Sequence, residues 1–435
     1  MLSTPRVRLG RLARLAGATL LAASALGSAP AGAAAKERPL PPPRDLTFYG
    51  RGWGHGVGMS QYGARGRALA GQTTAQILAH YYAGTSLGQR SPTTVVRVLV
   101  MTGFAATAAK PTIVTGRGGT WTIDGQAGTF PADARLTLAP TSTGATTWTL
   151  KVIASTGGLL KTATVSSAVV VRPASSASFL ELTSKASTAN QYRGYLRIRL
   201  TTTVMVVNHV GLDLYLRGVV PAEMPSSWPA EALKAQAIAA RSYAVNHLHP
   251  STGTYDVYDD TRSQVYRGRR GEAAAANAAI AATAGSVLLR GTAVANALFH
   301  SSDGGWTENN ENVFVSSTGA IVAGPVSYLR GSSDRAPDGT SYDAASPYAT
   351  WHTATYTWSA LSAIFGKDAR TNAGALSAID LSRRGVSGRL ISVTLTGSLG
   401  TKVVSGGVFV SVFNAGRPAA DPAMRGTLFA TAPIP

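Results

Sequence analysis

The stretch GLDLYLRGVVPAEMPSSWP, residues 211–229, sets the arrangement that we expect for the rest of the chain. Each of its prolines, Pro221, Pro225 and Pro229, disfavours helical geometry in the residue before it, so the segment ahead of Pro229 is not expected to be helical. Pro229 itself suits the first turn of a helix, because its missing N–H would have no partner there. The sequence therefore places Glu223 on a short, rigid loop that leads into a helix. Rigid loops on a scaffold often carry catalytic groups.

A long alanine-rich helix is expected to follow, from Pro229 to about His247. Its apolar residues recur at helical spacing and share one face, which carries Leu233, Ala237, Ala240 and Ala244. Pro250 and Gly253 mark its end.

Glu223 is a candidate general acid. Acidic residues are scarce in this chain, with 21 Asp and Glu against 40 Lys and Arg, and this one lies between two prolines among apolar neighbours. A carboxyl group in a partly apolar pocket has a raised pKa and can donate a proton near neutral pH. A solvated loop carboxylate is the alternative, because most acidic side chains are exposed.

The segment GVVPAEMP at residues 218–225, followed by WPAEALKAQAIAARSY at 228–243, closely resembles the signature of the stage II sporulation protein D / amidase enhancer LytB family. The resemblance implies a peptidoglycan-acting protein with an α+β core of mixed strands and helices. It also implies a role for Glu223, which matches the catalytic acid of a lytic transglycosylase in the sporulation member of that family.

The first 35 residues have the pattern of a secretory signal peptide. Four arginines precede a short apolar run at residues 15–26, and small residues at 31–35 supply cleavage sites. An uncleaved anchor is the alternative, but the run is too short to span a bilayer comfortably. No other stretch is long and apolar enough, so no stable transmembrane anchor is expected. Residues 36–46 form a Pro-rich extended linker.

Charge and cysteine content narrow the class of protein further. The net charge is +19, which less the four leader arginines is +15 for the secreted chain. Such a charge favours anionic wall polymers as partners, although solubility alone is the simpler explanation. Nucleic acid is not expected, since no basic run interleaved with aromatics is present. With no cysteine, the chain has no disulfide and no thiolate metal site.

A second motif, FYGRGWGHGVGMSQYGA, covers residues 48–64. Glycines at alternate positions allow positive φ and close backbone approach, so the stretch could line a groove and lead into a helix at about residues 74–82. His55 and Gln61 offer polar contacts, and Trp53 and Tyr62 offer flat faces for sugar rings, although a packed histidine is the alternative for His55. This string also resembles the family, where it normally lies near the C-terminus. Here, within residues 47–90, it precedes the Glu223 core.

Residues 91–190 are expected to form an all-β insert or accessory domain. Short β-branched runs occur there between Gly- and Ser/Thr-rich turns, at 95–100, 121–123, 136–138, 147–153 and 162–171. No catalytic constellation stands out, so a structural spacer and a wall-binding module are both open. The family pattern returns with strands at 192–198 and 203–209 and makes up the predicted core at 191–435.

The family often carries two Cys and a His that bind zinc after the core helix. The matching positions here are Tyr258, Ser263 and Arg262, so no zinc and no other cofactor is expected. His247 and His249 alone make a poor metal site. Gln264 and Tyr266 are retained, and the resemblance implies that they lie near the glycan cleft.

The segment HSSDGG at residues 300–305 matches a small, polar, glycine-rich segment of the family. The resemblance implies that His300, Ser301, Gly304 and Gly305 surround the glycan. A serine-hydrolase interpretation is disfavoured, because no Gly-x-Ser-x-Gly elbow and no third partner are evident. A helix at 273–284 and a hairpin at 287–299 precede this segment, and the tail is expected to form strands at 390–395, 401–404 and 408–413.

The chain offers one strong candidate carboxylate, Glu223, and three weak ones, Asp256, Asp303 and Glu308. This disfavours an ordinary glycosidase, which needs two catalytic carboxylates. A lytic transglycosylase needs one. The resemblance therefore implies a secreted, cell-wall enzyme that cleaves the MurNAc-GlcNAc backbone of peptidoglycan strands. The alternatives are a non-catalytic amidase enhancer that binds glycan and stimulates a cell-wall amidase, and a structural wall protein.

Overall fold

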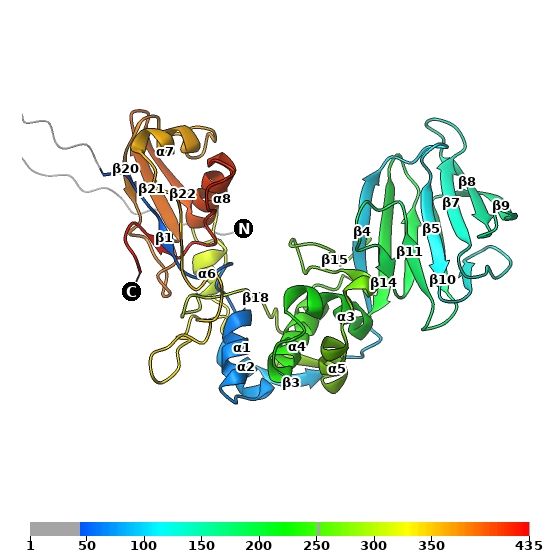
Figure 1. Ribbon diagram of the computed structural model, residues 1–435, viewed down its shortest axis with the longest axis horizontal. Coiled ribbons are helices and arrows are strands. Elements are labelled where there is room, and N and C mark those ends of the chain that lie inside the picture. The colour runs from blue at the N-terminus through cyan, green and yellow to red at the C-terminus, as the bar shows by residue number, and fades with distance from the viewer. Residues whose placement is uncertain (1–43, 250–252, 435) are drawn as a thin grey trace, which may run out of the picture. The chain divides into compact units, whose positions relative to one another are not determined.

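In the computed structural model, residues 44–249 and 253–434 are described. The predicted signal peptide at 1–35 and residues 36–43 of the predicted linker lie outside the described residues. Helices and strands alternate irregularly along the described chain and confirm the expected α+β class. The strands form two six-stranded sheets and several smaller ones (Figure 1).

The first six-stranded sheet joins the β-rich region to the predicted core. Its strand order is β15-β4-β14-β13-β10-β6. The strands are β15 (Val257–Tyr258), β4 (Val95–Phe104), β14 (Val204–Gly211), β13 (Tyr195–Arg199), β10 (Ala168–Pro173) and β6 (Trp121–Ile123). β4 runs antiparallel to β14, and β10 runs antiparallel to β13. Strands from the predicted insert at 91–190 and from the predicted core at 191–435 are therefore hydrogen-bonded to one another.

The second six-stranded sheet has the order β12-β11-β5-β7-β8-β9. Its strands are β12 (Gln191–Tyr192), β11 (Phe179–Leu182), β5 (Thr112–Arg117), β7 (Arg135–Pro140), β8 (Thr147–Ile153) and β9 (Leu159–Ser166). Val206 from β14 of the first sheet and Leu150 from β8 of the second belong to one buried apolar cluster. The run predicted at 162–171 is two strands, because Ser167, at φ 61°, turns the chain between β9 and β10.

Helix α4 (Ala230–Asn246) lies at the centre of the helical part of the fold. Its predicted apolar face is confirmed, since Leu233, Ala237, Ala240 and Ala244 all lie in the same buried cluster as residues of α3 (Leu212–Glu223) and α5 (Ala274–Ala282). Figure 1 shows these three helices grouped together. Another side of α4, with Ala235 and Ile238, packs in a second cluster with residues of the N-terminal motif. α5 also confirms the helix predicted at 273–284.

The segment ahead of Glu223 is helical, so the prediction of a loop there is wrong. Helix α3 tolerates Pro221 in its last turns and ends at Glu223, with Met224 as C-cap. A proline in a helix interior costs about 3 kcal/mol. Burying Leu212, Leu216 or Val219, each of which has no exposed surface, is worth about 1.5–3 kcal/mol per side chain. Packing of several such residues therefore outweighs the one lost hydrogen bond.

The N-terminal motif forms a helix that the sequence analysis did not anticipate. After the short strand β2 (Met59–Ser60), helix α1 covers Gln61–Leu69, and the Ser60 side chain accepts a hydrogen bond from the backbone N–H of Gly63 at 3.1 Å. The predicted second helix is confirmed as α2 (Thr74–Tyr81), which begins with a capping box of Thr73 and Gln76. The motif thus supplies both a glycine-rich loop and a helix that packs on α4.

The C-terminal part contains a third sheet with the order β20-β21-β22 and two helices. Strands β21 (Ser392–Gly397) and β22 (Gly400–Ser405) confirm two of the predicted tail strands, and β20 covers Leu376–Asp380. The third predicted tail strand is wrong: residues 406–416 form helix α8, and α7 covers Trp358–Phe365. Apolar residues recur there at helical spacing, which buries Phe409, Val412, Phe413 and Gly416.

Small sheets connect distant parts of the chain. β1 (Tyr49–Gly50) pairs with β19 (Trp351–His352) on one side and with β23 (Phe429–Ala430) on the other. The predicted hairpin forms as β16 (Ser286–Arg290) and β17 (Ala293–Val294), with β3 (Ser86–Gln89) on its other edge. The remaining elements are β18 (Phe299–His300), α6 (Asn310–Val313) and a 3₁₀ turn at Gly268–Gly271. Because β1 pairs with β23, the N-terminal motif lies beside the C-terminal strand although it precedes the core in sequence.

Candidate functional site

Glu223 ends helix α3 and lies half-buried. Its Oε1 accepts a hydrogen bond of 2.9 Å from the backbone N–H of Val265. Burial raises the pKa of Glu223 above its ordinary value, while the Val265 N–H and the Gln61 side chain act in the opposite direction. The net rise favours the protonated carboxyl, as a proton donor near neutral pH requires.

Gln61 reaches the same carboxyl from the N-terminal motif. It is the first residue of α1, and only 6% of its surface is exposed. Its Nε2 donates to Oε1 of Gln236, on α4, at 3.4 Å, and its amide lies close enough to Glu223 to lower the pKa of that carboxyl. The predicted site residues Gln61 and Glu223, 162 positions apart in sequence, are therefore brought together.

Two aromatic side chains near Glu223 were not singled out as site residues by the sequence analysis. Burial raises the pKa of Tyr243, on α4, and the negative charge of Glu223 adds to that rise. Glu223 also raises the pKa of Tyr215, which is fully buried on α3. Tyr243 lies one turn after Ala239 along α4. The sequence does not show which side of α4 faces the end of α3, so Tyr243 could not be assigned to the site from the sequence alone.

Gln264 and Tyr266 flank Val265 but are buried, with 1% and 2% of their surfaces exposed. The Gln264 Oε1 accepts from the Tyr215 hydroxyl at 3.2 Å, and the Tyr266 hydroxyl donates to Oδ1 of Asn208 at 2.9 Å. The predicted substrate contact does not match this burial. Both side chains instead anchor the segment whose backbone N–H holds Glu223.

Tyr62 and Ser301 lie beside the Glu223 site. β2 and β18 are parallel, with Ser60 opposite His300, and the Tyr62 N–H donates to the Ser301 carbonyl at 2.9 Å. The Tyr62 ring is partly exposed and packs edge-on against Trp228, with ring centroids 4.7 Å apart. Trp228 lies in the loop between Glu223 and α4, so Tyr62 is positioned next to the carboxyl-bearing segment.

His55 and His300 form a separate pair, with ring centroids 5.3 Å apart. Burial, reinforced by the nearby Arg389 guanidinium, lowers the pKa of His55 to about 4. Burial, His55 and Arg389 lower the pKa of His300 as well. Both rings are therefore neutral at pH 7. His300 is held by the Val57 carbonyl at 3.2 Å, and His55 lines a cavity of about 230 Å³ with Asn312 and Thr427.

Gly304 and Gly305 are buried in a turn built around carboxylates. The Gly304 N–H donates to Oδ2 of Asp343 at 2.7 Å, and the Gly305 N–H donates to Oδ1 of Asp303 at 2.9 Å. Both glycines have positive φ and line a small cavity of about 160 Å³ beside Trp306. The structure thus places them with one another and with Trp306, and no interaction between them and Glu223 is recorded among the described residues.

The three positions that match the family's zinc ligands contact one another. The Arg262 guanidinium lies over the Tyr258 ring at 3.8 Å, and the Ser263 hydroxyl accepts from the Tyr258 N–H at 3.2 Å. A phenol, a guanidinium and a hydroxyl do not form a zinc site, which takes thiolate, imidazole or carboxylate ligands. Within residues 44–249 and 253–434, no group of three His, Cys, Asp or Glu side chains is arranged to hold a metal ion.

The three weak carboxylate candidates of the sequence are all engaged elsewhere. Asp256 pairs with Arg97 at 2.6 Å. Glu308 is fully buried and accepts hydrogen bonds from Asn312, Val386 and Ser387. These carboxylates, like Asp303 in the glycine turn, therefore stabilise the fold.

Residues 201–289, which include α3, α4 and the Val265 segment, match the family model described as stage II sporulation protein. This chain carries a region similar to the SpoIID/LytB family. The resemblance inferred from residues 218–243 is thereby confirmed. Glu223 and Val265 lie inside the matched region, whereas Gln61 lies outside it.

Curated relatives agree with this assignment. The amidase enhancer of Bacillus subtilis (strain 168) is 38% identical over 151 residues, which cover 33% of this chain and 21% of the relative. The stage II sporulation protein D of the same organism is 32% identical over 126 residues, or 25% of this chain and 37% of the relative. An uncharacterized protein of Brachyspira hyodysenteriae is 36% identical over 125 residues, or 28% and 34% of the two chains. The chain thus spans between about a fifth and a little over a third of the curated relatives that it matches.

The raised pKa of Glu223 predicts a pH-dependent effect on stability. The folded state binds the proton more tightly than the unfolded state, so the contribution of Glu223 is most favourable below its unfolded pKa and declines as pH rises through the folded pKa. Glu223→Gln removes that declining contribution. We expect the variant to melt at a higher temperature than the wild type at pH 7, and the difference to close as the pH falls to about 4.

Glu231→Gln is the matched control for that measurement. The Lys234 ammonium and Thr74 lower the pKa of Glu231 to about 2, so its stabilising contribution is present above the unfolded pKa and lost as pH falls. We expect this variant to melt lower than the wild type at pH 7. Calorimetric melting curves at pH 7 and at about pH 4 measure the melting temperatures of both variants. If the two variants changed the melting temperature by the same amount, the assigned pKa directions would be contradicted.

Proposed function

We propose that this protein is a secreted lytic transglycosylase that cleaves the MurNAc-GlcNAc backbone of peptidoglycan, with Glu223 as its single acid/base. The observation that carries the proposal is the half-buried, hydrogen-bonded carboxyl of Glu223 with its raised pKa. Among the described residues, burial, Val265 and Gln61 account for that shift, and no second carboxylate contributes to it. An ordinary glycosidase would place a second carboxylate across the scissile bond.

The chemistry needs one group that first gives and then takes a proton. Protonated Glu223 donates to the glycosidic oxygen as the bond from that oxygen to C1 of the muramic acid breaks. The resulting carboxylate then removes the proton from the C6 hydroxyl of the same sugar, and O6 bonds to C1. The product is a 1,6-anhydro sugar, no water is consumed, and Glu223 ends protonated as it began.

The neighbouring groups suit this cycle. Burial keeps the carboxyl protonated before the reaction, and the Val265 N–H and Gln61 stabilise the carboxylate formed midway. Tyr62 offers a partly exposed ring beside the same segment, which supports a role in stacking on a sugar.

A non-catalytic amidase enhancer is the second candidate. It is favoured by the relative named amidase enhancer, which is 38% identical over the aligned residues. In that case the same surface would bind glycan strands and present them to a cell-wall amidase. Among the described residues, no helix has the length and apolarity needed to cross a bilayer. The basic, arginine-led pattern of residues 1–35 supports export to the cell wall.

Product analysis separates the candidates. The purified mature protein is incubated with intact peptidoglycan and with amidase-stripped glycan, and the soluble products are analysed by mass spectrometry. Anhydromuramic ends are the expected result, and the preferred substrate of the two shows whether stem peptides must first be removed. Reducing ends would indicate a hydrolase that uses water. Retention on glycan without any product would instead favour the enhancer.

We further propose that the activity is independent of zinc, because Tyr258, Ser263 and Arg262 stand at the positions that the resemblance matches to the family's zinc ligands, and Arg262 stacks on Tyr258. Dialysis against a chelator should leave both the melting temperature and the product yield unchanged, and elemental analysis should find no stoichiometric zinc. Arg262→Ala should lower the melting temperature, since the stacked pair is lost. Loss of activity on chelation that added zinc restores would contradict this proposal.

A further inference from the structure

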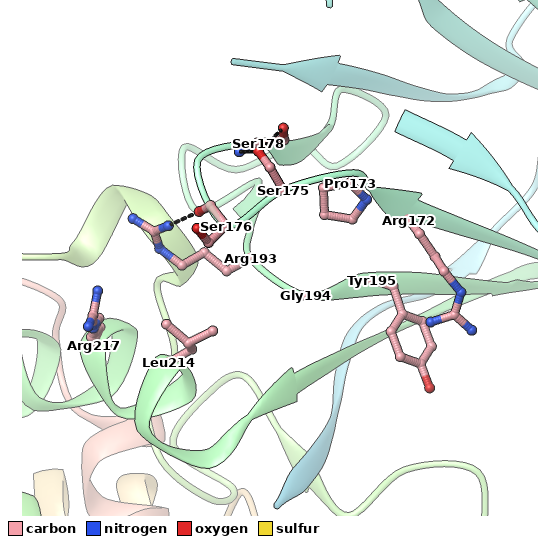
Figure 2. A pocket seen from close by; sticks show the side chains of 10 residues that line it. All are labelled: Arg172, Pro173, Ser175, Ser176, Ser178, Arg193, Gly194, Tyr195, Leu214 and Arg217. Carbon is pink, nitrogen blue, oxygen red and sulfur yellow. Dashed lines mark hydrogen bonds between the residues drawn. The ribbon is translucent and has the colours of Figure 1, made fainter. Parts of the chain in front are cut away.

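An arginine-lined pocket lies on helix α3, away from its Glu223 end. Its volume is about 570 Å³, and its lining comes from α3, from the start of β13 and from the end of β10 with the loop that follows. Figure 2 shows Leu214 and Arg217 on the helix side, Tyr195 and Arg172 on the strand side, and Ser175, Ser176 and Arg193 between them. None of these residues belongs to the Glu223 site described above.

Two of the three arginines are already paired. Arg193 makes two hydrogen bonds to the Glu272 carboxylate, and its Nη1 donates to the Ser176 carbonyl at 2.9 Å (Figure 2). Arg172 pairs with Asp124 at 2.8 Å and stacks on the Tyr195 ring at 3.9 Å. These contacts fix both guanidinium groups in place and balance their charge.

Arg217 is different. Among the described residues it has no ion pair or hydrogen bond, and its Nε is buried without a partner. Arg217 as a whole is only partly buried, so the terminal N–H groups of its guanidinium are the donors that a ligand oxygen could accept from. Since Asp124 and Glu272 compensate the other two arginines, Arg217 gives the pocket its excess positive charge.

We propose that this pocket binds an oxyanion, a phosphate or carboxylate group carried by a cell-wall polymer, with Arg217 as the group that contacts it. A guanidinium presents a planar fork of donors that matches the oxygen pairs of both anions. The serine-rich loop at residues 175–178 supplies hydroxyls beside it.

The position of Arg217 relates this pocket to the reaction. Arg217 and Glu223 lie six residues apart on the same helix, so they are separated by about 9 Å along its axis. The rigid helix would hold an anchored polymer in a fixed relation to the acid. That the polymer is peptidoglycan, or is attached to it, rests on the function proposed above, whereas the oxyanion site itself does not.

The test is binding of two soluble probes to the full mature protein, measured by calorimetry at low and at physiological ionic strength. One probe is a glycerol-phosphate oligomer, and the other is a muropeptide with free stem-peptide carboxylates. Amidated muropeptide serves as the uncharged comparison. We expect Arg217→Gln to weaken binding of one probe about tenfold, and Arg217→Lys, which keeps the charge without the fork, to weaken it less.

Arg135→Gln is the matched control, because Arg135 is an exposed arginine on β7, outside the lining of this pocket. It should bind both probes as the wild type does. Equal weakening by Arg135→Gln and Arg217→Gln, or no binding of either probe, would overturn the proposal. Glu223→Gln should retain full probe binding. Anion binding without cleavage products would therefore contradict the proposed transglycosylase activity and still support the oxyanion site.

Discussion

Glu223→Gln is expected to abolish release of anhydromuropeptides, with a loss of about 10³-fold in rate or more. The amide is nearly the same size as the acid, and it can still accept the Val265 N–H, so the local structure should persist. What it lacks is the transferable proton, and general acid–base catalysis contributes about 10²- to 10⁴-fold. Release of anhydro products from purified glycan, followed over time by mass spectrometry, measures the loss.

The control is again Glu231→Gln. Glu231 lies in the first turn of α4 and accepts a hydrogen bond from the Lys234 ammonium at 2.7 Å, and its pKa of about 2 keeps it ionised at working pH. It cannot act as a proton donor, so its variant should retain activity within about threefold. An active Glu223→Gln protein would refute the assignment of the acid. Binding of glycan by both Gln variants, without products from the wild type, would support the enhancer instead.

Gly58→Ala should have the largest effect on stability. Gly58 has φ +71°, and an added Cβ would lie 2.1 Å from the Leu298 carbonyl oxygen. That oxygen cannot easily move, because it accepts hydrogen bonds from the Tyr82 hydroxyl at 2.7 Å and from the Met59 N–H at 3.1 Å. Backbone strain and overpacking together should lower the free energy of unfolding by about 3 kcal/mol.

Gly71→Ala provides the comparison for the steric part of this effect. Gly71 also has a positive φ, +82°, but nothing lies within 4 Å of its added Cβ. It should lose only about 1–2 kcal/mol. Denaturant unfolding of both variants measures the difference. Activity should also fall in Gly58→Ala, since a shift of β2 moves Gln61 away from Glu223. If both variants lost the same free energy of unfolding, the steric clash with the Leu298 carbonyl would contribute nothing to the loss.

Much of the secondary structure was predictable because local patterns and packing agreed. The apolar spacing along α4 and the β-branched runs of β4, β6 and β8 each indicated the element that formed. Two of the wrong predictions arose where local patterns and packing disagreed. Three prolines argued against a helix at 212–223, but burial of its apolar residues prevailed. In α8, β-branched residues resembled a strand, although the spacing of Phe409, Val412 and Phe413 was helical.

The resemblance to the SpoIID/LytB family and the candidate acid Glu223 could both be read from one uninterrupted motif at residues 218–243. Which distant residues surround the Glu223 carboxyl became visible only from the packing of the folded chain. Gln61 and Val265 meet Glu223 because β2 pairs with β18 and the Val265 segment packs against α3, while Gln264 and Tyr266 turn into the core. Local sequence encodes backbone preference, but burial and hydrogen-bond partners depend on contacts between segments far apart in the chain.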